Sequence, residues 1–136
     1  HKTLKEDVIH LFRFMRNQRF PIESAIPIRF DKPNDGTSMD TLNNSYSFHY
    51  RRISTSGNGS RSVHSYGMAI DINPYNNPAV LANGKVIPQG GTYDRDIPGT
   101  LADTSPVVKE FIRLGWTWGG NWTSLKDYMH FEKKLP

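Results

Sequence analysis

The segment SVHSYGMAIDI, residues 62–72, decides the fold class that we predict. Its second part, residues 66–72, is typical of a strand, because apolar side chains recur at every second position. The opposite face of this strand carries Asp71, and the small residue Ala69 lies two positions before it. A carboxylate in the middle of an apolar strand indicates either a face open to solvent or a cleft that needs room.

The segment DYMHFE, residues 127–132, has the same layout near the end of the sequence. In a strand, His130 shares one face with Tyr128 and Glu132, and the apolar residues between them point the other way. Both segments therefore present an apolar face to a core and an ionisable side chain on the face turned away.

Two amphipathic helices are predicted around these strands. Apolar residues at helical spacing indicate a helix over residues 2–17, with Thr3 as its cap and Glu6 completing a capping box. A second helix is expected over residues 106–114, with Ser105 as its N-cap and a proline at its first position.

Further short strands are predicted between the helices. Residues 26–30 and 45–53 have strand-like patterns, and residues 31–38 and 54–62 are expected to be loops. Residues 73–99 hold many prolines and glycines and form an excursion with a small hairpin around the sequence LANGKV. The tail from Trp116 holds two Trp-rich strand pieces around a Gly-Gly turn. This order predicts the α+β class, with a mostly antiparallel sheet and flanking helices.

Composition limits the possible functions. The 136 residues fit a single domain, residues 1–136. The net charge of +4 permits an anionic partner such as nucleic acid or cell wall, but it is also ordinary for a soluble domain. The sequence has no run of five or more basic residues, so it does not predict a nucleic-acid partner. It also has no apolar run that approaches the roughly 20 residues of a membrane span. The first residues lack the features of a signal peptide. The sequence does not indicate an oligomeric state.

The absence of cysteine restricts any metal site to histidine and carboxylate ligands. His64, Asp71 and His130 form the smallest set that holds a zinc ion and leaves a fourth position open for water. Such a site needs a base, and Asp127 reaches it only if a turn precedes the strand of His130, because positions i and i+3 of a strand face opposite ways. Taken alone, a histidine in the position of His64 is more often structural than a metal ligand, and Asp127 fits a turn-forming aspartate as well as it fits a base.

Two motifs in order resemble a known family. The pattern S-x-H-x-x-G-x-A-x-D, followed by W-G-G-x-W-x-S-x-x-D-x-x-H-F-E, resembles the zinc peptidoglycan peptidases: D-alanyl-D-alanine carboxypeptidases and L-alanyl-D-glutamate endopeptidases. Their superfamily includes lysostaphin, the D-Ala-D-Ala metallopeptidases and the hedgehog domain. The resemblance runs from about Phe20 to Glu132. It implies one zinc peptidase domain with a hedgehog-like and DD-peptidase-like fold.

The resemblance also implies roles for individual residues. The zinc ligands of the family correspond to His64, Asp71 and His130. Asp127 corresponds to the general base, and Arg51 to an arginine that binds the substrate carbonyl and the oxyanion. Strand alternation places the neighbouring Arg52 on the opposite face, as a solvated charge.

Several other residues are expected to support the site or to contact substrate. Ser62 supports it by a hydrogen bond and Gly67 allows a close backbone approach, although simple turn chemistry explains both as well. His49 shares a strand face with Arg51 and is either a substrate contact or a bystander, because a fourth protein ligand would close the zinc. The aromatic residues form either a substrate wall or part of the core: Trp118, Trp122 and Tyr128.

The implied function is zinc-dependent hydrolysis of an amide bond in the peptidoglycan stem peptide, of either the L-alanyl-D-glutamate or the D-alanyl-D-alanine type. Action in the periplasm or outside the cell at the wall follows from this substrate, and a phage endolysin origin stays open. One alternative is a non-catalytic zinc-containing module that recognises cell wall or protein. Another is an α+β domain without metal.

Overall fold

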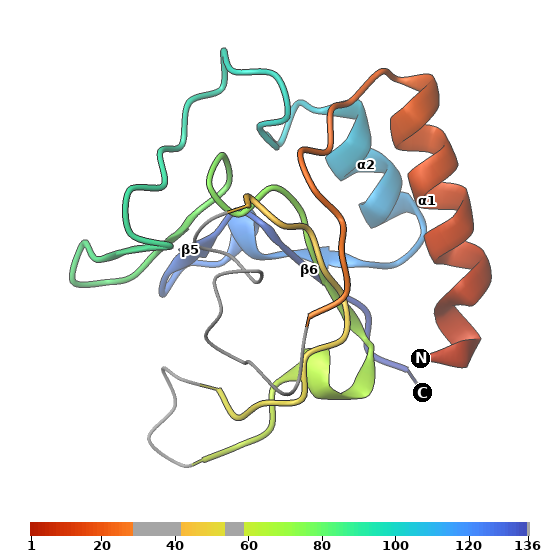
Figure 1. Cartoon of the computed structure of the whole chain (residues 1–136), viewed down its shortest axis with the longest axis horizontal. Coiled ribbons are helices and arrows are strands. Elements are labelled where there is room, and N and C mark those ends of the chain that lie inside the picture. The colour runs from red at the N-terminus through yellow and green to blue at the C-terminus, as the bar shows by residue number, and fades with distance from the viewer. Residues whose placement is uncertain (29–41, 54–58, 136) are drawn as a thin grey trace.

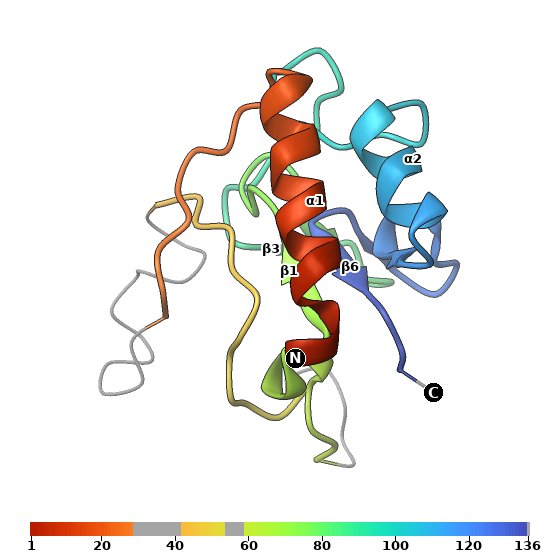
Figure 2. The same cartoon turned by 90° about the vertical axis from the view of Figure 1, so that its right-hand side faces the viewer.

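The computed structural model describes residues 1–28, 42–53 and 59–135. Two helices lie side by side on one flank of a small sheet, and a second small sheet lies at the end away from them (Figures 1 and 2). The elements in chain order are η1 Lys2–Leu4, α1 Lys5–Asn17, η2 Val63–Tyr66, β1 Ala69–Asp71, β2 Ala79–Val80, β3 Val86–Ile87, α2 Pro106–Arg113, β4 Thr117–Trp118, η3 Gly119–Asn121, β5 Lys126–Asp127 and β6 His130–Glu132. None of the described helices is long and apolar enough to cross a membrane.

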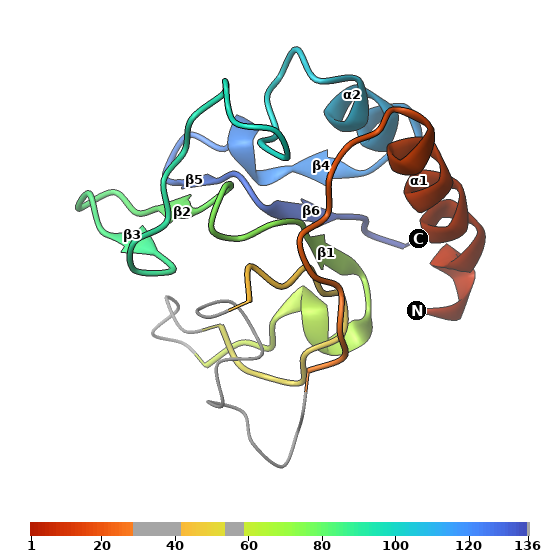
Figure 3. The ribbon, with the colours of Figure 1, turned by 45° about the horizontal axis from the view of Figure 1, so that its top comes forward.

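Both sheets are antiparallel. The first has the order β1-β6-β4, and Figure 3 shows these strands side by side. Its register pairs Ile70 with Phe131 and Asp71 with His130, so apolar residues meet on one face and ionisable residues on the other. The second sheet has the order β3-β2-β5. The α+β class and the antiparallel pairing are therefore confirmed.

The core lies between the apolar face of β1-β6-β4 and the two helices. Phe131 is fully buried and stacks on Phe111 of α2 at 3.8 Å between ring centroids. Leu11 and Met15 of α1 are also buried in this cluster, together with Ile70 of β1. The strands of the two predicted site segments thus bury their apolar sides, as the alternation predicted.

The helix predictions were correct in position and partly wrong in capping. Ser105 accepts a hydrogen bond from the Val107 backbone N–H at 3.3 Å and caps α2 as predicted. At α1, the predicted Thr3 cap and capping box are wrong, because residues 2–4 form a 3-10 turn and the N-cap position falls on Leu4, which makes no side-chain cap.

The strand predicted over residues 45–53 is wrong. The segment makes only isolated bridges, of Tyr46 with Asp71 and of Arg52 with Arg61. Beyond Tyr46 the chain leaves β1, and its backbone bonds to the loop around η2 instead: His49 N–H donates to His64 O at 3.3 Å. Tyr46 and Ser47 thus lie beside β1, whereas residues 49–52 lie beside residues 61–64.

The remaining strand and loop predictions have mixed outcomes. The described part of segment 26–30, residues 26–28, is not a strand, and its last two residues lie outside the described residues, as does the loop predicted at 31–38. Of the loop at 54–62, residues 54–58 lie outside them too. The hairpin around LANGKV is confirmed, because β2 pairs with β3 across it.

One buried asparagine attaches the excursion after β1 to the end of that strand. The Asn77 amide group donates hydrogen bonds to the carbonyl oxygens of Ile72, Asn73 and Gly99 at 3.0–3.2 Å. Its Oδ1 accepts from the Leu101 N–H at 2.6 Å, and the side chain is fully buried. The backbone of the strand that carries Asp71 is therefore held by side-chain bonds as well as by the sheet.

We predict that Asn77→Asp lowers the free energy of unfolding by about 3 kcal/mol or more, because a buried carboxylate would face three carbonyl oxygens without a proton to donate. Urea unfolding followed by circular dichroism measures the change. Asn83→Asp is the matched control: Asn83 is exposed and its Oδ1 accepts from the Lys85 N–H, which a carboxylate also does. Equal stability losses in the two variants would contradict the role of Asn77.

Candidate metal centre

Three buried ionisable side chains meet on the polar side of the first sheet. The β1–β6 register places Asp71 opposite His130, and η2 brings His64 over them. His130 Nδ1 lies 2.9 Å from Asp71 Oδ1, His64 Nε2 lies 3.2 Å from His130 Nδ1, and His64 Nε2 lies 3.3 Å from Asp71 Oδ1. The structure thus brings together the three residues predicted as metal ligands.

The triangle of ligand atoms fits a tetrahedral metal ion. With metal–ligand bonds of about 2.0–2.1 Å, the ligand atoms of a tetrahedral zinc site lie about 3.3 Å apart. The three observed separations, 2.9, 3.2 and 3.3 Å, are close to this edge length. Within the described residues this is the one group of three His, Asp or Glu side chains that could hold an ion. Two imidazoles and one carboxylate are also a donor set that zinc accepts.

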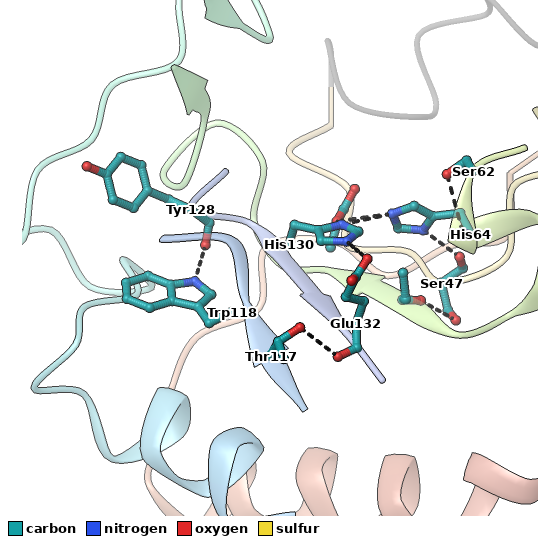
Figure 4. A network of polar contacts seen from close by, with 10 residues as sticks. Ser47, Ser62, His64, Thr117, Trp118, Tyr128, His130 and Glu132 are labelled. Carbon is teal, nitrogen blue, oxygen red and sulfur yellow. Dashed lines mark hydrogen bonds and ion pairs between the residues drawn. The ribbon is translucent and has the colours of Figure 1, made fainter. Parts of the chain in front are cut away.

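The ring nitrogen of each histidine that points away from the triangle has its own partner (Figure 4). His64 Nδ1 lies 2.8 Å from the carbonyl oxygen of Ser47, so it carries the proton and donates it. His130 Nε2 lies 3.3 Å from the Glu132 carboxylate. The ring atoms left for a cation are therefore His64 Nε2 and His130 Nδ1, which are the two atoms of the triangle.

Local turn chemistry sets the position of His64. Ser62 is buried and caps η2 by accepting the His64 N–H at 3.3 Å. Gly67 ends η2 with a left-handed φ of 63°, which an L side chain rarely adopts, and the chain then enters β1. Ser62 thus holds the backbone of His64. At Gly67 the turn conformation and a close backbone approach both favour glycine, because a Cβ there would lie 2.5 Å from the His1 backbone nitrogen.

The charges of the triangle depend on one another. Burial opposes a charged carboxylate, but His64 and His130 outweigh it and hold the pKa of Asp71 well below its usual range. Burial likewise opposes a charged imidazole, but the hydrogen bonds that His130 donates to the Asp71 and Glu132 carboxylates raise its pKa to about 10. Both ring nitrogens of His130 are therefore protonated at neutral pH, and a metal ion that binds Nδ1 must displace the proton on that atom.

Asp127 lies at the end of β5, and a two-residue turn separates it from β6. The chain therefore bends between positions 127 and 130. This is the turn that the Asp127 side chain needs in order to point to the same side as His130. Burial, and next the charge of Asp71, raise the pKa of Asp127 to about 6. Gly119 makes this position possible, because a Cβ there would lie 2.5 Å from the carbonyl oxygen of Asp127.

Four buried polar atoms around the triangle have no hydrogen-bond partner in the described part of the chain: Tyr46 Oη, His49 Nδ1, Arg51 Nε and Asp127 Oδ1. Buried polar groups are nearly always paired, so such a cluster indicates a place where solvent, an ion or substrate completes the bonding.

The residues of segment 42–53 within this cluster face the same charges. Burial, and then Arg51 and His64, lower the pKa of His49. Burial and Asp71 hold the pKa of Tyr46 well above its usual range, so its hydroxyl stays protonated. Arg51 is half-buried, whereas Arg52 is exposed and donates to Gly59 O. Arg51 is therefore the one of the two arginines that faces the site.

The three aromatic candidates differ in exposure. Trp122 is half-buried beside His130, at 5.3 Å between ring centroids, and lines a cleft of about 580 Å³ with Thr117 and Glu132. Trp118 is 3% exposed and belongs to the core, so only the part of its ring that lines this cleft is available to a ligand.

Tyr128 is half-buried and contacts the excursion after β1. It stacks on Tyr93 at 3.6 Å and its carbonyl accepts from the Trp118 indole at 2.8 Å. These contacts fix the turn between Asp127 and His130.

Comparison with known proteins places the chain in a family. Residues 55–133 match the model of a family described as D-alanyl-D-alanine carboxypeptidase. The chain belongs to this peptidase family. The resemblance predicted from the two motifs is thereby confirmed, since the matched range contains both.

A curated relative is the peptidoglycan L-alanyl-D-glutamate endopeptidase CwlK of Bacillus subtilis (strain 168). It is 36% identical over 80 residues, which cover 59% of this chain and 44% of the relative. The matched part is thus less than half of that relative. No solved structure matches the chain.

Sequence reasoning gave no role to three residues that the structure places at the site: Tyr46, Ser47 and Glu132. Alternation places Glu132 on the strand face of His130, but it does not indicate a contact with the imidazole. No sequence signal identifies Ser47, because its contribution to His64 is a backbone carbonyl. Tyr46 was placed only within a strand that does not form.

We predict that zinc binding displaces about one proton per ion near pH 7.5, and that affinity rises about tenfold per pH unit between pH 7 and about 9, because His130 must lose its proton first. Calorimetric titration in buffers of different ionisation enthalpy measures the released proton. His10→Ala is the control: His10 is an exposed histidine of α1 and its loss should leave binding unchanged. A proton count of zero would contradict His130 as a ligand.

Proposed function

We propose that this protein hydrolyses an amide bond in the stem peptide of bacterial peptidoglycan, with zinc held by His64, Asp71 and His130. The observation that carries the proposal is a cluster of buried polar groups: Asp127 and Arg51 each have an unpaired buried atom, and Asp127 lies close enough to Asp71, His64, His130 and Arg51 for their charges to act on its pKa. When bound, zinc supplies Lewis-acid chemistry, which polarises a carbonyl and makes water more acidic.

In this mechanism Asp127 is the general base. It takes a proton from the attacking water and later gives it to the leaving amine, so the peptide bond breaks with one water consumed. A carboxylate with a pKa of about 6 is a better base near neutrality than an ordinary aspartate. Because Asp127 is not part of the ligand triangle, it is free for this task.

Arg51 is the oxyanion-stabilising residue in this mechanism. Its guanidinium lies close enough to Asp127, His49 and Tyr46 to influence the pKa of each. A fixed cation at this place favours the negative charge that develops on the carbonyl oxygen. The cleft lined by Trp122 next to His130 offers room for the peptide on one side of the scissile bond.

The bond that we propose is the one between L-alanine and D-glutamate. The relative that is 36% identical carries that activity in its name, whereas the family description names D-alanyl-D-alanine carboxypeptidase. Digestion of defined muropeptides followed by mass spectrometry decides between the bonds. A muropeptide fragment that ends in L-alanine, together with a peptide that begins with D-glutamate, supports the endopeptidase, and loss of a terminal D-alanine supports the carboxypeptidase. The place where this protein acts would then be the periplasm or the cell wall.

We predict that Asp127→Asn keeps zinc and loses hydrolysis by about 10²–10⁴-fold, because the amide cannot take a proton. Elemental analysis measures the zinc, and fragment release from purified peptidoglycan measures the activity. Equal product release by the variant and the wild type would exclude Asp127 as the base. A wild type that binds zinc and wall fragments without cleaving them would instead favour a recognition module.

We predict that Arg51→Ala lowers kcat by about 10²–10³-fold through loss of oxyanion stabilisation, whereas Arg52→Ala stays close to wild type. The two arginines are adjacent and carry the same charge, so any effect of net charge on binding to the wall appears in both variants. Steady-state kinetics on a soluble muropeptide measure both. Equal losses in the two variants would remove Arg51 from the mechanism.

A further inference from the structure

Glu132 contacts Nε2 of His130, which is the ring nitrogen that points away from the ligand triangle. Its Oε2 lies 3.3 Å from His130 Nε2, and its side chain is 19% exposed. The other two carboxylates at the site are placed differently: Asp71 contacts Nδ1 of the same ring, and Asp127 is not bonded to His130. Among the described residues, Glu132 is therefore the carboxylate bonded to Nε2.

The strand makes this contact rigid. Residues 130 and 132 share a face of β6, and β6 is the central strand of its sheet. Glu132 is paired with Ala69 of β1 on one side and with Thr117 of β4 on the other. The Thr117 hydroxyl also donates to the Glu132 carbonyl oxygen at 3.2 Å. The backbone of Glu132 is thus held by β1 on one side and by β4 on the other, which restricts where its carboxylate can lie.

The contact decides which nitrogen of His130 faces a metal. The two ring nitrogens point in different directions, so a carboxylate that accepts a proton from Nε2 leaves Nδ1 unprotonated and turned toward Asp71 and His64. A histidine ligand commonly donates its second N–H in this way, which fixes its tautomer and its orientation. His64 has the same arrangement, but its acceptor is the uncharged carbonyl of Ser47.

We propose that Glu132 is a positioning residue that holds His130 with Nδ1 toward the metal and thereby sets the metal affinity of the site. The proposal rests on the metal site of the proposed function but not on hydrolysis. Loss of such an outer partner commonly weakens metal binding by about 10–100-fold.

The test compares Glu132→Ala, Glu132→Gln and Lys134→Ala by zinc competition with a chromophoric chelator. We expect a 10–100-fold weaker zinc Kd for the alanine variant and a smaller loss for glutamine, whose amide oxygen still accepts the Nε2 proton. Lys134 is the matched control: it is an exposed charge two residues further along that does not contact His130. Its removal should leave the Kd unchanged.

A second measurement keeps the proposal testable if the alanine variant folds poorly. In zinc-loaded protein with ¹⁵N-labelled histidine, we expect His130 to show a bonded Nε2–H that exchanges slowly in the wild type and in Glu132→Gln. A zinc Kd for Glu132→Ala within twofold of wild type, or a His130 that binds zinc through Nε2, overturns the proposal. If the wild type binds zinc but cleaves no peptidoglycan, the proposed function fails and the role of Glu132 stands.

Discussion

The pairing of β1 with β6 is the constraint on which the core and the site both depend. Two neighbouring pairs of residues show this: Ile70 pairs with Phe131 in the core, and Asp71 pairs with His130 in the site. Because side chains alternate along a strand, a slip of one residue would turn the charged pair into the core and the apolar pair outward. The free energy of burying Phe131 between the helices and the sheet therefore also selects the register that assembles the ligand triangle.

The site is held together at a cost in stability. A buried carboxylate and two buried imidazoles lie within 3.3 Å of one another, and four further polar atoms around them lack partners among the described residues. An unpaired buried polar group costs about 1–3 kcal/mol. The asparagine network after β1 and the aromatic core beneath the sheet offset this cost. Such an arrangement is typical of a site prepared for an ion and a substrate.

Much of this arrangement could be predicted from sequence, and the reason for the remainder is physical. Helical spacing identified both helices, and alternation identified the polar face of the strand of His130. The path of residues 45–53 could not be predicted, because a run that alternates aromatic and polar residues also suits a chain that crosses the edge of a sheet. Its bonds go to η2 and to Asp71, which are distant in the sequence. The proton acceptor of His64 could not be predicted from the sequence for another reason. It is a backbone carbonyl oxygen, and every residue has one.

The different supports of the two imidazoles have an evolutionary consequence. His64 is oriented by the main chain of Ser47, which no codon change at that position removes, so this half of the site is robust to point mutation. His130 is oriented by a side chain, so one nucleotide change can weaken or retune it. Divergent members of the lineage could adjust how tightly they hold their ion at residue 132 and leave the architecture around residue 47 untouched.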